Sequence, residues 1–529
     1  MITQATIFAG TNTDEPDVLR SLTQNIDRFG RERIDAKAID REHRIPRELL
    51  REAAVLGLFG LSIPEEHGGA GFSLSGVCTA IAALARWDRS LATTVGLHLG
   101  LGTRPLVAFG SAALRERYLP DLAAGSKIAA FATTEPAAGS DLSAIRTTAT
   151  ATATATEMAT ETATATATNE LAEANALIVR GDKIYVTNGG LASVVTITAS
   201  TPSLGGARRG HSLLLLERED KGVDVGPEES KLGLRGSSTV PLYFDDVRVP
   251  MSRVIGEPGK GMSHLEHVLA WGRTAMAAGC TGAARTALMS AVEYVTARVQ
   301  FGKRLAELDV VKAQVAKMAA LCFSMEALVS AVGLVADDPD RLLRRSISAK
   351  VFASESDWTV VDMALQLHGG SGFIEETPMP MLLRDARITR IFEGANDVLL
   401  VHAGTIEIAQ PDTRPDFVED ASPRGALAQQ ANAFHRRVRE KLEALKAAHG
   451  LRLLRRHLDI HALGRLVVLR DACDAAVARA IAEGSDSAHS LAQFFLDGAQ
   501  VEAKMHLEPC PPLEGVRTIA GSVYAEVVG

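Results

Sequence analysis

Residues 384–398 read RDARITRIFEGANDV and place one carboxylate, Glu393, on a short turn between two segments with helical patterns. Gly394 follows it, which permits a tight turn and lets a ligand approach the backbone. The neighbouring Phe392 favours a raised pKa for Glu393, because apolar surroundings disfavour the charged form of a carboxyl group. This setting is typical of a general base that removes a carbon-bound proton. The alternative is a structural glutamate, which caps a helix or pairs with an arginine of the same stretch.

The composition indicates a globular protein with several domains. A chain of 529 residues is too long for a single core, so we expect about three or four domains. The net charge of -8 argues against a nucleic-acid partner. The five cysteines form no CxxC pair, which argues against a disulfide framework or a metal centre and indicates a reducing compartment.

The first residues and the apolar segments bear on location. Residues 1–19 (MITQATIFAGTNTDEPDVL) have no basic start and turn acidic at Asp14, which argues against a secretory signal or a transit peptide. No apolar run reaches the length needed to span a bilayer. We therefore expect a cytoplasmic protein that contacts a membrane at most from its surface.

The hydrophobic pattern changes along the chain, and each change predicts a domain boundary. Helical spacing dominates residues 15–125, short β-branched segments separated by turns fill 127–244, and long helical patterns occupy 262–408. A stretch rich in Pro and Asp, 411–423, reads as a linker before further helical patterns. We predict a mostly helical α+β fold with a helical domain at 1–126, a middle β domain at 127–261, a helical bundle at 262–410 and a C-terminal helical extension at 411–529.

One segment of the middle domain is nearly pure Ala-Thr alternation. It forms an insertion at about 147–170 and has no large side chain to bury, so burial cannot offset its ordering entropy. We expect a protruding surface insertion, disordered or weakly hairpin-like, and a small change in stability when residues 149–168 are deleted.

Three further motifs each carry a modest signal. Residues 131–141 (FATTEPAAGSD) crowd hydroxyls and backbone N–H groups at a strand end, which suits a polar ring or a phosphate but also an ordinary turn. In residues 183–190 (KIYVTNGG), Tyr185 and Thr187 share one side of a strand, which suits a flat heterocycle or a half-buried strand. Residues 298–304 (RVQFGKR) end a long helix with cations, which can bind phosphates or simply face solvent.

Taken together and in this order, the motifs resemble the acyl-CoA dehydrogenase family from about residue 15 to residue 408. The stretches LFGLSIPEEHGGAGFS, FATTEPAAGSD, KIYVTNGG, GLRGSSTVPLYFDDVRVP, QFGKRL, QLHGGSGF and RIFEGANDVL carry the resemblance. It implies an N-terminal helical domain, a β-barrel-like middle domain and a four-helix bundle. It also implies FAD held without a G-x-G-x-x-G fingerprint, and no such fingerprint follows a strand in this sequence.

The resemblance also implies roles for single residues. Glu393 matches the catalytic base, and Gly272 stands where one branch of the family carries its base instead. Ser140, Arg273 and Gly394 would contact the substrate. Contacts to FAD would come from residues of four motifs and one helix start: Thr134, Gly139, Ser140, Tyr185, Thr187, Arg298, Phe301, Gln366, Gly369, Gly370 and Asp397. Arg298, Phe301, Gln366, Gly369 and Gly370 would reach the FAD of a neighbouring subunit, which implies a homo-oligomer, either a dimer or a tetramer.

The sequence departs from the family in several places. Ala395 stands where Glu-Gly is usually followed by Thr, Leu308-Asp309 replaces a frequent His-Gln, and Tyr185 stands where many members have Trp. The extension beyond residue 410 resembles the very-long-chain branch, whose members form dimers and associate with membranes. Its basic residues can meet anionic headgroups or form a solvated, internally paired helix face: Arg436, Arg437, Arg439, Lys441, Arg452, Arg455 and Arg456.

The implied reaction is α,β-dehydrogenation of a saturated acyl-CoA to a trans-2-enoyl-CoA. Glu393 would take the α-proton, flavin N5 would accept a hydride from the β-carbon, and an electron-transferring flavoprotein would receive the electrons. We expect chains of roughly C12 or longer, since each buried methylene gains ~0.8 kcal/mol and Ala275, Ala277, Ala278 and Gly279 leave room for a deep pocket. The alternatives are an acyl-carrier-protein thioester dehydrogenase or flavin oxidase on the same scaffold, or a non-enzymatic assembly factor.

Overall fold

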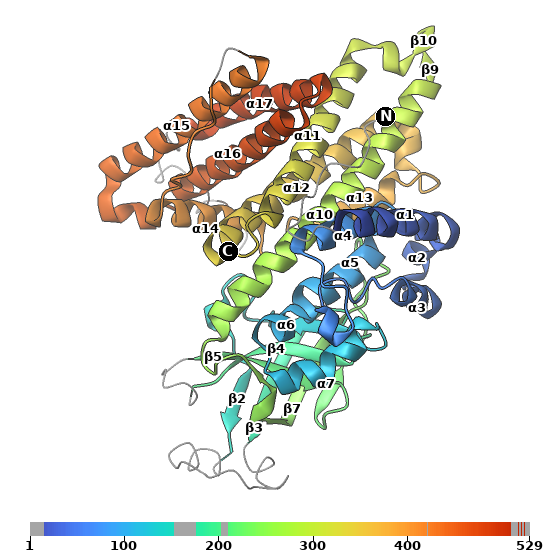
Figure 1. The fold of residues 1–529 in the computed structure, drawn as a ribbon, viewed down its shortest axis with the longest axis vertical. Coiled ribbons are helices and arrows are strands. Elements are labelled where there is room, and N and C mark those ends of the chain that lie inside the picture. Colours follow the sequence, from blue (N-terminus) through green and yellow to red (C-terminus); the bar gives the residue numbers. More distant parts are fainter. Residues whose placement is uncertain are drawn as a thin grey trace. The chain divides into compact units, whose positions relative to one another are not determined.

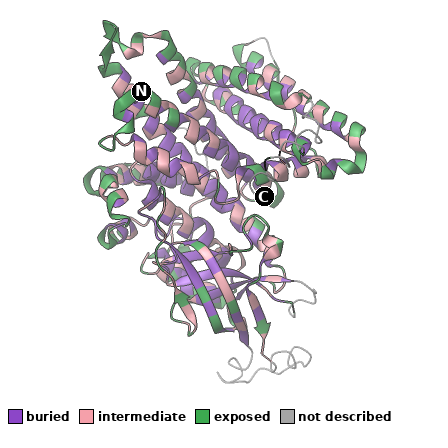
Figure 2. Ribbon diagram, turned by 180° about the vertical axis from the view of Figure 1, so that it is seen from behind, coloured by how far each residue is buried: buried purple, intermediate pink, exposed green. Residues whose placement is uncertain are grey.

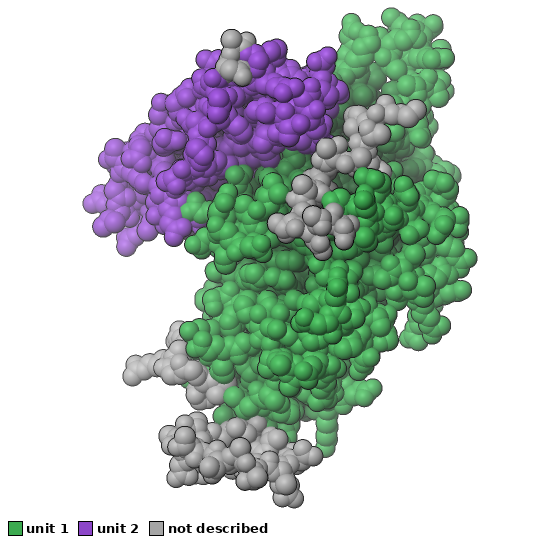
Figure 3. Space-filling model, in the orientation of Figure 1, with its two compact units in different colours: residues 1–395 green, residues 396–529 purple. Residues whose placement is uncertain are grey.

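The computed structural model describes residues 15–152, 176–202, 210–419 and 422–508, together with Arg517, Ala520 and Val523. The chain divides into two compact units, Met1–Ala395 and Asn396–Gly529 (Figure 3). Helices dominate both units and the described strands lie in the first, so the predicted mostly helical α+β fold with additional C-terminal helices is confirmed.

Unit 1 begins with short helices around an apolar core. α4 and α5 lie against the long helix α10, Gly261–Ala297 (Figure 1). α5 starts where it does because the carboxylate of Asp88 accepts a hydrogen bond from the N–H of Leu91, at 2.6 Å. The helices are α1 (Glu15–Arg33), α2 (Ala36–Glu42), α3 (Arg47–Val55), α4 (Leu74–Ala85), α5 (Arg89–Leu97), α6 (Arg104–Phe109) and α7 (Ala112–Ala123).

A π-helical turn, His98–Gly102, follows α5 and brings it close to α10. A Cβ atom on Gly100 would lie 3.2 Å from the Cα of Gly272 in α10, so the two backbones approach closely only because both positions are glycine. The contact between Gly100 and Gly272 therefore places the turn after α5 directly against α10.

The middle part of unit 1 is an eight-stranded sheet, as far as the chain is described. Its strand order is β6-β7-β3-β2-β4-β5-β8, with β1 paired in parallel to β4. Many residues of its strands are buried (Figure 2), and their apolar side chains form one cluster. The strands are β1 (Ala129–Ala132), β2 (Thr148–Ala151), β3 (Ala176–Thr187), β4 (Val194–Ser200), β5 (His211–Glu217), β6 (Val223–Val225), β7 (Thr239–Pro250) and β8 (Val254–Ile255).

The first part of the Ala-Thr segment belongs to this sheet and pairs in the hairpin-like way that we expected, but it is not confined to the surface. β2 pairs antiparallel with β3, where Ala149 lies opposite Val179, and Ala149 is fully buried. Ala and Thr alternation satisfies the period of a strand when a neighbouring strand supplies the apolar partners. Residues 153–170 of the expected insertion lie outside the described residues.

The prediction that deleting residues 149–168 has little effect is therefore replaced by a sharper one. Ala149→Asp should destabilise the fold by about 3 kcal/mol or more, because it buries a charge without a partner. Thr150→Asp is the matched control, since Thr150 is exposed on the same strand. Thermal unfolding of both variants measures the difference, and equal melting temperatures would show that β2 does not contribute to stability.

Three long helices follow the sheet and pack on one another within unit 1: α10, α11 (Asp309–Gly333) and α12 (Pro339–His368). A two-stranded hairpin of β9 (Val299–Gln300) and β10 (Lys303–Arg304) connects α10 to α11, and α13 (Met379–Ile388) follows α12. α11 is long and apolar enough to cross a bilayer by length and composition, and 56% of its apolar window is buried within the fold. Our statement that no apolar run reaches that length is therefore wrong, although core helices of soluble proteins pass the same criterion.

Unit 2 is helical where it is described. α16 is its central helix and packs against the other three, α14, α15 and α17. The predicted linker is attached to this unit rather than free, because Arg414 pairs with Asp471 at 2.6 Å and with Asp474 at 2.7 Å on α16. The helices are α14 (Asn396–Ala409), α15 (Pro423–His449), α16 (His457–Glu483) and α17 (Asp486–Leu507).

Candidate active site

Glu393 lies on the turn that follows α13, as the sequence predicts. Its backbone adopts a left-handed φ of 58°, and Gly394 has a φ of 97°. Two buried cations hold this turn: Arg273 Nε donates to the carbonyl of Glu393 at 3.0 Å, and Lys350 Nζ donates to the carbonyl of Gly394 at 2.7 Å. The unusual φ of a glutamate is thus stabilised by hydrogen bonds to two consecutive carbonyl groups.

The arginines of the same stretch do not take up the Glu393 carboxylate. Arg384 pairs with Asp40 at 2.5 Å, and Arg390 pairs with Glu355 at 2.9 Å. The alternative of a structural ion pair for Glu393 therefore finds no support in these two arginines.

The electrostatic surroundings of Glu393 suit a base that works near neutral pH. Its Oε2 atom is buried and has no hydrogen-bond partner among the described residues, while the residue as a whole keeps partial exposure. Burial raises the pKa of Glu393 to about 7, and the charges of Arg273 and Lys350 oppose that rise. Burial also lowers the pKa of Lys350 to about 7. A carboxyl group with this pKa is well matched to proton abstraction.

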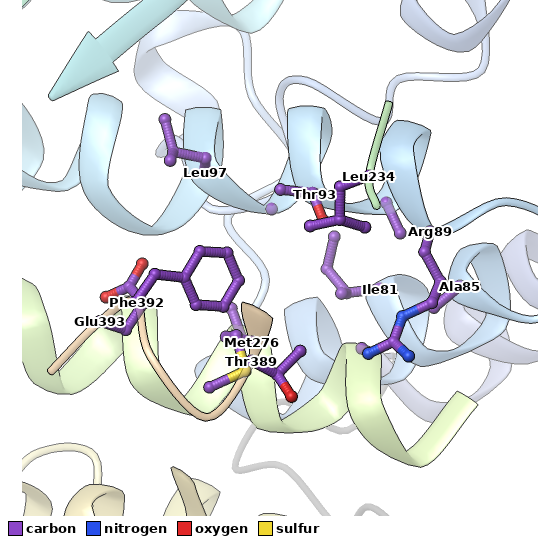
Figure 4. A pocket seen from close by; sticks show the side chains of 15 residues that line it. Ile81, Ala85, Arg89, Thr93, Leu97, Leu234, Met276, Thr389, Phe392 and Glu393 are labelled. Atoms are coloured by element: carbon purple, nitrogen blue, oxygen red, sulfur yellow. The ribbon is translucent and has the colours of Figure 1, made fainter. Parts of the chain in front are cut away.

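The carboxylate faces a narrow, largely apolar pocket of about 560 Å³, counting the part open to solvent. Figure 4 shows Glu393 and Phe392 on one side of the pocket and Arg89 on the other. One face of α10 forms a wall through four residues at helical spacing, namely Gly272, Ala275, Met276 and Gly279. Of the small residues that we expected along this wall, Ala277 and Ala278 are absent because they are buried on other faces of the helix.

Gly272 leaves the space that the Glu393 carboxylate occupies. A Cβ atom at position 272 would lie 3.1 Å from Oε2 of Glu393 and 2.4 Å from Cδ2 of the buried Leu101. The two positions that carry a base in different branches of the family therefore face the same point of the pocket, and in this chain Glu393 supplies the carboxylate there.

The residues assigned to the flavin ring lie on β3 and in the segment directly after β1. The N–H of Ile184 donates to the carbonyl of Thr134 at 2.9 Å, which brings Thr134 beside Tyr185. Tyr185 is 63% exposed, has a φ of 57° and lies in a bulge, so the simple alternation that we assumed for Tyr185 and Thr187 is interrupted there. Gly139 and Ser140 are exposed on the loop after β1.

A second group of assigned residues lies far from Glu393. Arg298 and Phe301 lie at the hairpin after α10, and Gln366, Gly369 and Gly370 lie at the end of α12, all exposed. The ring of His368 on α12 stacks on Tyr294 near the end of α10, with centroids 4.6 Å apart, so both groups occupy the same end of these helices. Asp397 belongs to unit 2, where it lies 3.3 Å from His461.

Family models decide what this combination of domains and motifs represents. The N-terminal, middle and C-terminal domains of acyl-CoA dehydrogenases match residues 16–126, 130–247 and 259–404 in that order. The chain belongs to the acyl-CoA dehydrogenase family. The resemblance seen in the sequence is thereby confirmed.

The chain covers different shares of its relatives within the family. The mitochondrial very long-chain specific acyl-CoA dehydrogenase of Bos taurus is 34% identical over 394 residues, which are 73% of this chain and 57% of the relative. The chain thus spans little more than half of that relative. An acyl-CoA dehydrogenase of Bacillus subtilis is 33% identical over 392 residues, which are 73% of this chain and 96% of the relative.

A solved structure resembles the chain over nearly its whole length. The acyl-CoA dehydrogenase from Bacillus anthracis, complexed with FAD, matches with a TM-score of 0.82 at 26% identity, over 93% of this chain and 87% of that one. Such coverage reaches beyond residue 410, so the helices of the extension also occur in that acyl-CoA dehydrogenase.

Sequence reasoning missed three residues of the site. Lys350 lies in SISAKVFASES, whose small residues signal a tightly packed helix face, so its burial could have been inferred. Leu234 lines the pocket from the loop before β7, where its N–H donates to Asp385 at 2.6 Å. Arg89 lines the pocket from the first turn of α5, and no feature of its local sequence distinguishes it from a surface arginine.

The two cations at the turn lead to a prediction about pH dependence. If Glu393 is the base, kcat/KM should rise with pH through about 7, because the carboxyl group must lose its proton to act. Arg273→Met removes a charge that lowers the pKa of Glu393, so the profile should move to higher pH, and Lys350→Met should move it in the same direction. Arg285→Met, on the same helix but outside the pocket lining, is the control. Coincident profiles for Arg273→Met and the unaltered protein would contradict the assignment.

Proposed function

We propose that this protein is an FAD-dependent acyl-CoA dehydrogenase, which converts a saturated acyl-CoA to the trans-2-enoyl-CoA. The observation that carries the proposal is Glu393, a carboxylate whose pKa is raised to about 7, at the mouth of a narrow apolar pocket. Family membership supports it as well.

The protein's own residues account for proton removal. The α-proton of a thioester is weakly acidic, so a base must lie against it in surroundings that exclude water. The apolar pocket wall binds the alkyl chain and leaves the carboxylate of Glu393 facing the α-carbon. Arg273 and Lys350 keep the turn in place through the carbonyl groups of residues 393 and 394, so the carboxylate itself remains available.

The residues around Tyr185 suit a flat and partly polar ring. Tyr185 offers an exposed aromatic face close to Thr134 and Thr187, and the hydroxyl of Thr133 is buried without a partner among the described residues. Bound FAD supplies the acceptor for the hydride that leaves the β-carbon. Gly139 and Ser140 would contribute exposed backbone and hydroxyl groups beside that ring.

The separation of the two cofactor groups supports an oligomer. Arg298 directly follows α10 and lies 26 positions after Gly272, which corresponds to about 39 Å along a helix. Arg298 and Phe301 therefore cannot reach the Glu393 pocket of their own chain, and with Gln366, Gly369 and Gly370 they would hold the FAD of another copy. Asp397 would contribute to cofactor binding from the start of α14.

We propose an electron-transferring flavoprotein as the electron acceptor, and a membrane surface as a further contact of unit 2. For the membrane contact, Leu451 and Leu454 are 95% and 54% exposed beside Arg452 and Arg455. Apolar and basic side chains together are the combination that binds an anionic membrane surface.

The extension and the pocket support different lengths of the acyl chain. The extension supports long chains, because it resembles that of the very-long-chain branch. The pocket favours shorter ones, because its wall on α10 runs from Gly272 to Gly279, about 10 Å, and the charged Arg89 lies at its far side.

The experiment is anaerobic reduction of the bound flavin by saturated acyl-CoAs of graded length. Bleaching by at least one member of the series, with formation of the enoyl thioester, supports the proposal. Rapid reoxidation of the reduced protein by air would instead indicate an oxidase. Protein purified without flavin, and unable to bind added FAD, would contradict the proposal.

A further inference from the structure

The far end of the pocket holds an arginine with unused hydrogen-bonding capacity. Arg89 is only 6% exposed, and its Nη2 donates to Asp357 at 2.8 Å. Its Nη1 atom is buried and has no hydrogen-bond partner in the part of the chain that the structure describes. An unmet donor on a buried cation is costly, so a group that accepts a hydrogen bond is expected to fill this place when the pocket is occupied.

Exposure shows which end of the pocket is closed. Near the carboxylate, Gly96, Leu97, Phe392 and Glu393 all keep partial exposure. Around the arginine, the lining residues Ile81, Ala85, Arg89 and Ala92 are buried, whereas Thr93, Met276 and Gly279 keep partial exposure. An acyl group that enters beside Glu393 and follows the buried side of the pocket ends at Arg89, and Figure 4 shows these two side chains on opposite sides of the pocket.

The end of the pocket near Arg89 combines apolar side chains with one hydrogen-bond donor that has no partner among the described residues. Ile81, Ala85 and Ala92 offer no side-chain hydrogen bonds, and the hydroxyl of Thr389, which donates to the carbonyl of Ala386 at 2.7 Å, makes no hydrogen bond with Nη1. A purely alkyl chain end would leave Nη1 of Arg89 without a partner. An oxygen atom at this depth would accept a hydrogen bond from it.

Charge favours a neutral acceptor over a carboxylate. The fully buried Asp357 already neutralises Arg89, and the buried Asp385 adds a second acidic group that acts on the guanidinium. A substrate carboxylate would add another negative charge beside these two buried acidic groups. A ketone, hydroxyl or ester oxygen accepts the hydrogen bond without adding charge.

We propose that Arg89 is a specificity-determining residue that donates a hydrogen bond from Nη1 to a neutral oxygen near the far end of the acyl group. The inference rests on the proposed dehydrogenase function. The preferred substrates are then acyl thioesters of medium length that carry such an oxygen, because the wall from Gly272 to Gly279 spans about 10 Å.

The test compares three CoA thioesters of equal length: octanoyl-CoA, an oxo-octanoyl-CoA with its ketone next to the terminal methyl group, and octanedioyl-CoA with a terminal carboxylate. For the unaltered protein, kcat/KM of the ketone should exceed that of octanoyl-CoA by roughly tenfold or more, as expected for a hydrogen bond to a charged group. The dissociation constants of the same thioesters, measured on Glu393→Gln to prevent turnover, should show the same order.

Variants then assign the preference to Arg89. The double variant Arg89→Met with Asp357→Asn removes the donor without leaving an unpaired buried charge, and Arg89→Lys keeps a cation for Asp357 but lacks Nη1. Both should bring the ratio of ketone to octanoyl close to one. Arg285→Met, which breaks the 2.6 Å pair with Glu326 outside the pocket lining, should preserve the ratio.

Several results would overturn the inference. They are an equal or better kcat/KM for octanoyl-CoA than for the ketone in the unaltered protein, a preference for octanedioyl-CoA, or an unchanged ratio in the variants. Failure of the proposed function looks different, because the flavin would then stay oxidised with all three thioesters.

Discussion

Glu393→Gln should lower kcat for acyl-CoA dehydrogenation by roughly 10²–10⁴-fold, the usual contribution of a general base, while FAD remains bound. The amide has the shape of the carboxyl group but does not accept a proton at neutral pH. Oε2 of Glu393 makes no hydrogen bond within the described residues, so the substitution breaks no hydrogen bond of that atom. The backbone bonds from Arg273 and Lys350 to the turn should persist.

Flavin absorbance after anaerobic addition of an acyl-CoA measures the effect. Glu326→Gln is the matched control, because Glu326 is a partly buried carboxylate on α11 that pairs with Arg285 and does not line the pocket. Turnover in Glu393→Gln within tenfold of the unaltered protein would mean that the base lies elsewhere. Loss of bound FAD in the variant would assign Glu393 a role in the fold of the site.

Arg89→Met alone should destabilise unit 1 by roughly 3–5 kcal/mol, because it leaves the carboxyl group of Asp357 buried without its cation. Adding Asp357→Asn should recover part of this loss, since the buried charge is then gone. The difference between single and double variants gives the coupling energy of the pair.

Urea unfolding followed by circular dichroism measures these changes. Lys312→Met provides the comparison with a surface pair, because Lys312 and Asp309 are largely exposed and their charged atoms lie 2.9 Å apart. It should lower the stability far less than Arg89→Met does. A cost for Arg89→Met as small as that of Lys312→Met would show that the buried pair does not stabilise the fold.

The turn that carries Glu393 could be predicted from the sequence because its signals are local. Phe392, Glu393 and Gly394 adjoin one another, and their turn needs no distant partner to be recognised. The domain order could be predicted for a similar reason, since helical and strand periodicities extend over whole domains.

The rest of the site depends on contacts between distant segments. Arg89 meets Asp357 at a separation of 268 positions, and Leu234 is held by Asp385 at a separation of 151. No pattern around Arg89 distinguishes a pocket residue from a surface arginine. The Ala-Thr segment misled us because its composition is the same inside and beyond β2, while the pairing with β3 begins the strand at Thr148.

The most direct test of the central claim is one anaerobic turnover of the FAD-loaded protein with the best acyl-CoA of the length series, followed by mass spectrometry of the thioester. We predict that the flavin bleaches and that the thioester loses two hydrogens to give the trans-2-enoyl product. Thioesters of every length recovered unchanged, with the bound flavin still oxidised, would contradict the account.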